Sequence, residues 1–292
     1  MRTHVCQIWI GIGCKSYRVY VRDRGIAHGA RLGAGSDSGQ RNIHKAHDMQ
    51  TYDLDDGYGG AAKLGLIVLS TDETLENEAR QVLAGRAVSL VHARIRAEAD
   101  VTPEALKMME KRLPEVAQLL PQGLKAVGYA CTSASTVIGP ARVAELVQDS
   151  HPEAAVSDPI SAVMAGLHAL KAKRIAFVSP YVKEVTAPMR ALLSANGFEA
   201  VSEFSFAERE DRKVARISEQ STLEAIENVS KISECDAVFA SCTNLRTFGI
   251  LQEAEQRAGC PVISSNQALL WHLLKLAGLK SVGWGPGALF KQ

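Results

Sequence analysis

The sequence has no excess of charge of either sign and no long apolar run, and both absences exclude whole classes of protein. Its 292 residues contain 33 lysines and arginines against 32 aspartates and glutamates, which gives a formal net charge of +1. Proteins that bind nucleic acid or an acidic membrane surface usually carry a basic excess, so we expect neither partner. No apolar stretch approaches the roughly 20 residues that a membrane-spanning helix needs.

Cysteine is scarce and occurs in no metal-binding spacing. Six cysteines in 292 residues do not form a dense disulfide scaffold, and no CxxC pair predicts structural zinc. The histidines at positions 92, 151, 168 and 272 show no metal spacing either. We therefore predict free thiols, a reducing cytoplasmic location, and a protein that uses neither a metal nor a cofactor.

Residues 1–60 lack glutamate and any sustained helical or alternating apolar pattern. We predict an irregular or disordered extension that the folded part does not need, with Met49 as an alternative start. The apolar segment 5–14 behind Arg2 resembles part of a secretion signal. It is short, interrupted by glycine and without a small-residue cleavage site, so we do not expect it to act as one.

From Lys63 onward, strand and helix patterns alternate. Short connections between them favour parallel sheets with helices on both faces. Because the order repeats, we predict an α/β fold of two pseudo-symmetric parallel-sheet domains, 61–159 and 160–292, with the site in the cleft between them. The C-terminal helix can cross back to the first domain. The predicted strands are 64–69, 88–95, 125–130, 154–156, 174–178, 198–204, 236–240 and 261–264, and the predicted helices are 74–83, one from 102, 137–148, 182–195, 222–233, 245–257 and 267–276.

Two cysteines end apolar runs of the same kind. Cys131 follows 126–130 and precedes Thr-Ser, and Cys242 follows 237–241 and precedes Thr-Asn. Open α/β sheets place ligand chemistry where such strands end. We expect each sulfur to lie near a helix N-terminus, where the helix dipole favours a thiolate.

A single cysteine at the end of a buried strand is usually just a small apolar side chain. The repeated context favours a reactive pair instead. Cys235 and Cys260 flank strand or helix ends without such a motif, and we interpret both as structural. Cys6 and Cys14 carry no signal.

The two cysteine motifs resemble those of the aspartate/glutamate racemase superfamily, and most closely its maleate isomerase and arylmalonate decarboxylase branch. The similarity covers roughly 64–279. Within the branch, the sequence is most similar to the EutA subfamily of ectoine-utilisation proteins. The motifs that carry these resemblances are 67–76, 131–135, 179–182, 206–215, 241–247 and 262–268.

The resemblance implies a cofactor-independent isomerase or racemase of a small carboxylate or amino acid, and its EutA part suggests a substrate from ectoine degradation. A carbon acid needs a base, an acid on the opposite face and stabilisation of the enolate-like carboxylate. Cys131 and Cys242 can act as that acid and base, or one thiolate can add to a carbon–carbon double bond. The expected substrate-binding residues are Asp72, Thr132, Ser133, Tyr181, Thr243 and Asn244.

Some positions depart from the related patterns. The maleate isomerase pattern has asparagine at the position of Asp72, and an aspartate there would attract an ammonium group and repel a carboxylate. Asp72 can equally cap the following helix. Thr132 and Asn244 differ from the glutamate racemase pattern. Cys131 argues against decarboxylase chemistry, because arylmalonate decarboxylases lack that cysteine.

Two alternatives stay open beside the isomerase or racemase hypothesis: a maleate cis–trans isomerase, and a binding protein without turnover. The expected partner is the small substrate, and a homo-oligomer is possible. The resemblance also places Asp211 and Arg212 near a substrate-facing position of the branch.

Overall fold

The fold is built on strands that are almost continuously buried. The computed structural model describes residues 52–55 and 57–292, so most of the predicted N-terminal extension lies outside the described residues. In β1, every residue except Lys63 is buried, as expected for a parallel strand covered on both faces. The first sheet has the order β2-β1-β3-β4, all parallel, with β1 Ala62–Leu69, β2 Val88–Ile95, β3 Ala126–Ala130 and β4 Ala155–Ser157.

The second sheet repeats the first. Its order is β6-β5-β7-β8, again all parallel, so each strand has a counterpart in the same place in the first sheet. This confirms the predicted α/β fold of two pseudo-symmetric parallel sheets. The strands are β5 Arg174–Tyr181, β6 Glu199–Glu208, β7 Ala237–Ala240 and β8 Val262–Ser264.

Most predicted helices are present, with two corrections. The helix predicted at 137–148 is two helices, because the chain breaks at Gly139, whose φ of 95° suits glycine, and restarts at Pro140. The helix predicted at 245–257 begins only at Leu251. The helices are α1 Leu75–Leu83, α2 Pro103–Ala117, α3 Thr132–Ile138, α4 Pro140–Gln148, α5 Pro159–Ala169, α6 Lys183–Ala195, α7 Asp211–Val214, α8 Glu219–Ser230, α9 Leu251–Ala258 and α10 Ser265–Leu276, followed by the 3₁₀ turn η1 Ala288–Lys291.

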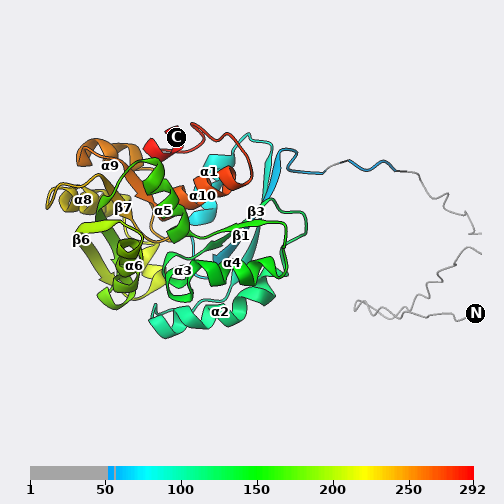
Figure 1. Ribbon diagram of the computed structural model, residues 1–292, viewed down its shortest axis with the longest axis horizontal. Coiled ribbons are helices and arrows are strands. Elements are labelled where there is room, and N and C mark those ends of the chain that lie inside the picture. Colours follow the sequence, from blue (N-terminus) through cyan, green and yellow to red (C-terminus); the bar gives the residue numbers. More distant parts are fainter. Residues whose placement is uncertain (1–51, 56) are drawn as a thin grey trace, which may run out of the picture. The chain divides into compact units, whose positions relative to one another are not determined.

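Helices α5 and α10 pack on each other and on both sheets (Figure 1). Although α10 directly follows β8, it contacts β3, β4 and α1 as well. It approaches β3 closely at Gly128, where a Cβ would lie 2.9 Å from Leu273 and 2.8 Å from Leu66. One hydrophobic core therefore joins residues of the two sheets through this helix pair.

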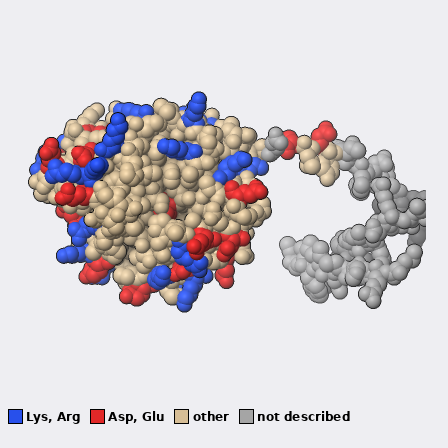
Figure 2. Space-filling model, viewed as in Figure 1, with Lys and Arg blue, Asp and Glu red and all other residues tan. Residues whose placement is uncertain are grey.

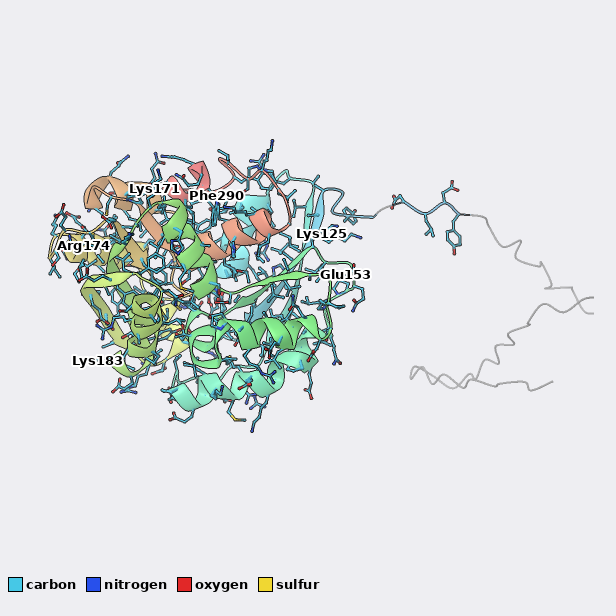
Figure 3. All side chains as sticks on the ribbon, viewed as in Figure 1. Lys125, Glu153, Lys171, Arg174, Lys183 and Phe290 are labelled. Atoms are coloured by element: carbon cyan, nitrogen blue, oxygen red, sulfur yellow. The ribbon has the colours of Figure 1, made fainter. Side chains whose placement is uncertain are left out.

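The carboxyl ends of the two sheets point toward each other. Figure 3 places Lys125, just before β3, and Arg174, at the start of β5, at opposite sides of the molecule. The strands therefore run from the outside toward the middle, where ligand chemistry is expected. Figure 2 shows acidic and basic side chains interspersed over the visible face. In the described part of the chain, no helix has the length and apolar character that a membrane crossing requires.

Candidate active site

Cys131 lies between β3 and α3, at the N-cap position of that helix. Its Sγ accepts a hydrogen bond from the Ala134 amide at 3.3 Å, so this sulfur does sit at a helix start. The side chain is 6% exposed. Burial, reinforced by the Asp211 and Asp72 carboxylates, raises the pKa of the thiol to about 12.

Cys242 lies at the equivalent point of the second sheet, after β7, but in a different local structure. The expectation of a helix N-terminus is wrong here, because turns follow and α9 begins only at Leu251. The backbone of Cys242 has a φ of 101°, which a non-glycine residue rarely adopts. Its Sγ accepts from the Asn244 amide at 3.3 Å. Burial and then Asp211 raise the pKa of this thiol well above its usual value.

One buried hydroxyl joins the two cysteine motifs. Ser265, the first residue of α10, accepts a hydrogen bond from the Cys242 amide at 3.0 Å and another from the Thr132 hydroxyl at 2.8 Å. In the same region the Thr243 hydroxyl donates to the Ala130 carbonyl at 3.4 Å. The structure thus brings the two predicted motifs together, with the hydroxyls of both threonines bonded to protein atoms.

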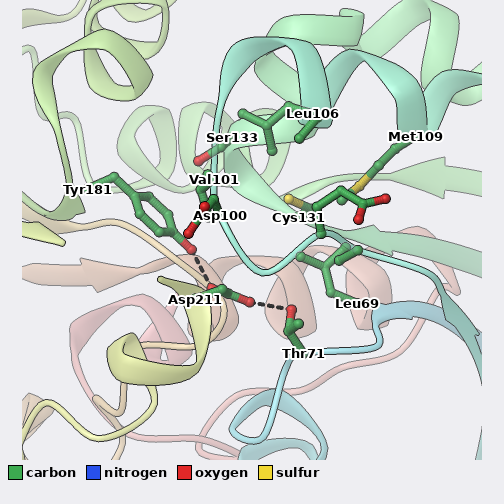
Figure 4. A pocket seen from close by; sticks show the side chains of 13 residues that line it. Leu69, Thr71, Asp100, Val101, Leu106, Met109, Cys131, Ser133, Tyr181 and Asp211 are labelled. Atoms are coloured by element: carbon green, nitrogen blue, oxygen red, sulfur yellow. Dashed lines mark hydrogen bonds between the residues drawn. The ribbon is translucent and has the colours of Figure 1, made fainter. Parts of the chain in front are cut away.

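Tyr181, the last residue of β5, connects Cys242 to a buried carboxylate. Its hydroxyl lies 3.2 Å from Cys242 Sγ and donates to Asp211 Oδ1 at 2.6 Å. The Thr71 hydroxyl donates to the other oxygen of Asp211. Figure 4 shows Tyr181, Asp211 and Thr71 on one side of a cavity, with Cys131 on the other. Cys242 is not among the residues that line this cavity. Ser133 also lines that cavity.

Asp72 follows β1 and is 2% exposed. Its Oδ1 accepts from the amides of Thr74 and Leu75, both at 2.9 Å, so Asp72 does cap the start of α1. Its Oδ2 is buried and has no hydrogen-bond partner within 3.5 Å among the described residues. Burial raises the pKa of Asp72 to about 6, with Asp211 adding to the increase. The negative charge of Asp72 also helps to raise the pKa of both cysteine thiols.

The side chain of Asn244, a predicted substrate-binding residue, makes three hydrogen bonds to protein atoms. Its side-chain nitrogen donates to the backbone carbonyls of Thr71 and Asp211 at 3.2 and 3.0 Å. Its side-chain oxygen Oδ1 accepts from the Glu73 amide at 2.9 Å. All three bonds connect the loop after β7 to segments after β1 and β6. Asn244 therefore holds the two halves of the site in place, and its amide is already bonded.

Glu78 on α1 supports the loop that carries Cys242. One carboxylate oxygen accepts from the amides of Thr247 and Phe248 at 2.9 and 3.0 Å, and the other accepts from the Asn266 side chain at 2.7 Å. These bonds fix the segment between Cys242 and the start of α9. Burial raises the pKa of Glu78 to about 7.

A segment after β2, residues 97–101, covers the cavity. Its Val101 amide donates to the Arg209 carbonyl at 2.9 Å, and its Ala99 carbonyl accepts from the Asp211 amide at 3.2 Å. Side chains of the segment line the cavity that Cys131 faces. The segment therefore bridges the two halves directly over one of the two thiols.

Sequence reasoning missed Thr71, Ser265, Glu78 and the 97–101 segment. Thr71 and Ser265 follow the ends of β1 and β8, so the rule that found the cysteines applies to them as well. Glu78 carried no such signal, because a glutamate inside an amphipathic helix usually faces solvent. Among the described residues, no group of three histidine, cysteine or acidic side chains is placed to hold a metal.

Comparisons with known proteins agree with the fold that carries this site. A model of the arylmalonate decarboxylase family matches residues 64–290. A maleate isomerase from Nocardia farcinica (strain IFM 10152) is 30% identical over 249 residues, which are 80% of this chain and 97% of that protein. The structure of Nocardia farcinica maleate cis-trans isomerase bound to TRIS has a TM-score of 0.70 at 28% identity and covers 79% of this chain and 98% of its own.

A further structure of the same Nocardia farcinica enzyme is a cysteine-to-serine mutant with a covalently bound succinylcysteine intermediate. It also has a TM-score of 0.70 at 28% identity, and it covers 79% of this chain and 98% of its own. In that relative, then, a cysteine bonds covalently to a reaction intermediate.

Proposed function

This chain belongs to the arylmalonate decarboxylase family, and from that premise we propose that it is a cofactor-independent isomerase or racemase of a small carboxylate or amino acid. The observation that carries the proposal is the placement of Cys131 and Cys242 after the equivalent strands β3 and β7. The succinylcysteine intermediate of the Nocardia farcinica relative supports a reactive cysteine. Cys131 favours isomerase over decarboxylase chemistry, since arylmalonate decarboxylases lack the first cysteine.

In the two-base reaction, one cysteine as thiolate takes the proton from the α-carbon of the substrate. The electron pair passes into the adjacent carboxylate, and the other cysteine as thiol donates its proton to the opposite face. No net proton is gained or lost, and the roles of Cys131 and Cys242 reverse for the opposite enantiomer. The Ser133 hydroxyl lines the cavity and can donate to the carboxylate as its charge develops.

A thiolate must form before the reaction can begin, and the charges of the site set the pKa at which it forms. The Asp72 and Asp211 carboxylates oppose ionisation of both thiols. An ammonium group bound beside these carboxylates offsets their charge and thereby lowers the pKa of the thiols. If it also takes over an oxygen of Asp211, the Tyr181 hydroxyl is free to donate to Cys242 Sγ and stabilise the thiolate.

The same charges favour an amino acid as the substrate. Asp72 and Asp211 are 2% and 1% exposed, and neither forms a side-chain ion pair with a described lysine, arginine or histidine. Buried carboxylates normally have a counter-ion, which a substrate ammonium would supply. The resemblance to the ectoine-utilisation subfamily supports an amino acid derived from ectoine.

The test is hydrogen exchange at the α-carbon. The full-length protein is incubated in D2O with amino acids and diamino acids, and deuterium incorporation is followed by mass spectrometry or NMR. We expect incorporation from both enantiomers with the wild type, and a fall of about 100-fold or more for one enantiomer in Cys131→Ala and for the opposite enantiomer in Cys242→Ala, since acid–base catalysis contributes that much. Cys235→Ala, at the far end of β7, is the matched control and keeps the wild-type rate.

The two single variants also test whether the reaction uses two bases. In a two-base reaction, a variant that retains one thiol can still exchange the α-proton of one enantiomer. Exchange at the wild-type rate in both Cys131→Ala and Cys242→Ala would exclude the proposed roles.

A maleate cis–trans isomerase is the second candidate, favoured by the 30% identity to the Nocardia farcinica enzyme. In that reaction a thiolate adds to the double bond, the single bond rotates, and the thiolate leaves. Conversion of maleate to fumarate, measured by the change in ultraviolet absorbance, would identify it. The Asp72 and Asp211 carboxylates have no cationic side-chain partner among the described residues, so they repel a dianionic substrate. We therefore place this candidate second.

A further inference from the structure

Two cysteines outside the site, Cys235 and Cys260, lie side by side. Their sulfur atoms are 3.9 Å apart, and both are free thiols. Each precedes a strand of the second sheet, Cys235 before β7 and Cys260 before β8. They therefore lie at the amino ends of the same two strands whose carboxyl ends lead to Cys242 and Ser265.

The two sulfurs lie close to bonding distance on neighbouring segments of the second sheet. Val238 of β7 is opposite Val262 of β8, and the Val238 amide donates to the Pro261 carbonyl at 2.9 Å. Cys235 and Cys260 directly precede these paired strands, one residue out of register with each other. Adjacent strands run roughly 4.8 Å apart, which is compatible with the roughly 4.4–6.8 Å between the Cα atoms of a disulfide. From 3.9 Å, the sulfurs must approach to about 2 Å for the bond to form.

The pair is also more accessible than the thiols of the site. Cys235 and Cys260 are half-buried, whereas Cys131 and Cys242 are 6% and 5% exposed. Burial and then the neighbouring Cys235 thiol raise the pKa of Cys260 to about 12. Because the two sulfurs are 3.9 Å apart, whichever is oxidised first has the other within reach.

We propose that Cys235 and Cys260 are a reversible oxidation site that takes up a peroxide and closes to an intrachain disulfide. The Cys235 sulfur attacks the peroxide oxygen and becomes a sulfenic acid, and one water leaves. The Cys260 sulfur then attacks the Cys235 sulfur, the S–S bond forms, and the hydroxyl leaves as a second water. The two thiols together lose two electrons and two protons, and the peroxide is reduced to two waters.

The expected consequence is a more stable second sheet with an unobstructed site. The bond would connect β7 and β8 at the ends remote from Cys242 and would close a loop of 24 intervening residues. A cross-link of that length restricts the unfolded chain appreciably. Thiol reductants reverse it.

The test treats the full-length protein with hydrogen peroxide and maps unreduced peptides by mass spectrometry. We expect a peptide pair joined through Cys235 and Cys260, with a loss of two free thiols and a rise in melting temperature of about 5 °C. Dithiothreitol should reverse both changes. Cys235→Ser and Cys260→Ser should each abolish the rise, and Cys131→Ala, which removes a cysteine of the site, should keep it.

Three results would overturn the proposal: a first cross-link that involves Cys131 or Cys242, sulfenic acid at Cys235 that never converts to a disulfide, or an unchanged melting temperature once the Cys235–Cys260 link has formed. Because the readouts are a mapped bond and a melting temperature, they do not depend on catalytic turnover.

Discussion

The two carboxylate oxygens of Asp72 have different surroundings. Oδ1 caps α1, while Oδ2 is buried without a hydrogen-bond partner within 3.5 Å among the described residues. The capping interpretation made from the sequence is therefore correct, and it leaves the second oxygen available. That division makes Asp72→Asn an informative substitution, because the asparagine oxygen can keep both capping bonds.

We expect Asp72→Asn to lower kcat/KM for a diamino or amino acid at least tenfold and to raise it for maleate. Loss of one of two negative charges weakens attraction for an ammonium group and lessens repulsion of a dianion. The measurement is kcat/KM for both substrate types in both proteins, with Asp158→Asn, a buried aspartate that caps α5, as the control. An equal loss for both substrates would assign Asp72 a structural role only, and a wild type that prefers maleate would contradict the amino-acid proposal.

Glu78 gives the protein a stability that depends on pH. Its pKa rises from 4.5 in the unfolded chain to about 7 in the folded one, chiefly through burial. Between these values the folded protein holds a proton that the unfolded chain has released. This contribution to stability is therefore present at low pH and is lost as the pH rises from about 4.5 through about 7.

We expect Glu78→Gln to remove that dependence. Glutamine keeps the oxygen that accepts from Thr247 and Phe248 but cannot ionise, so its stability relative to wild type should improve by on the order of 3 kcal/mol as the pH rises through this window. Urea unfolding across the pH range measures the difference. Parallel curves for the two proteins would show that Glu78 does not titrate on unfolding.

At the level of elements, the apolar pattern of the sequence predicted the strands and most of the helices. Strand β7 is buried along its whole length, and the second half of β2 alternates between exposed and buried residues. The positions of both strands follow from the sequence alone. Helix α5 was not predicted, although Asp158 and Pro159 supply a helix start. Its residues are apolar on nearly all sides because α10 and both sheets surround it, so no helical stripe was visible.

The site was predictable only in part for a related reason. Cys131 and Cys242 carry a local motif that marks strand ends. Most of the bonds of Asn244, Glu78 and Ser265 join residues 133 to 188 positions apart. The two shorter separations are 33 for Asn244 and Asp211 and 23 for Ser265 and Cys242. No local pattern encodes such partners, so their roles emerge only once both sheets are placed.

The 97–101 segment is the element on which access to Cys131 depends. Two backbone hydrogen bonds connect it to the loop after β6, at the Val101 and Asp211 amides. The segment lies outside both sheets and forms an isolated bridge between Asp100 and Glu210, so we expect it to open locally at a lower free energy than the core. We expect amide hydrogen exchange at Val101 and Asp211 to be faster than in β3 and to slow when a substrate or inhibitor is bound. Equal protection in the segment and in β3 would show that the cavity opens only by global unfolding.

At the scale of the whole molecule, the two sheets repeat one another but do not form independent units. Residues of both belong to one hydrophobic core, and α10 follows the second sheet in sequence while packing on β3 of the first. The domain boundary predicted at residues 159 and 160 stays a prediction. The shared helix pair implies that neither half can bury its apolar surface alone, and that the halves unfold together.

We therefore expect a single calorimetric unfolding transition, with equal calorimetric and van't Hoff enthalpies. Leu273→Ala tests the reason. Leu273 on α10 is fully buried against Gly128 of β3, so its truncation should cost about 2–5 kcal/mol and move the whole transition to lower temperature. The surface substitution Leu119→Ala, at a side chain that is 72% exposed, should leave the transition in place. Two resolved transitions, with Leu273→Ala shifting only one of them, would show that the halves are thermodynamically separate and that α10 stabilises the first sheet alone.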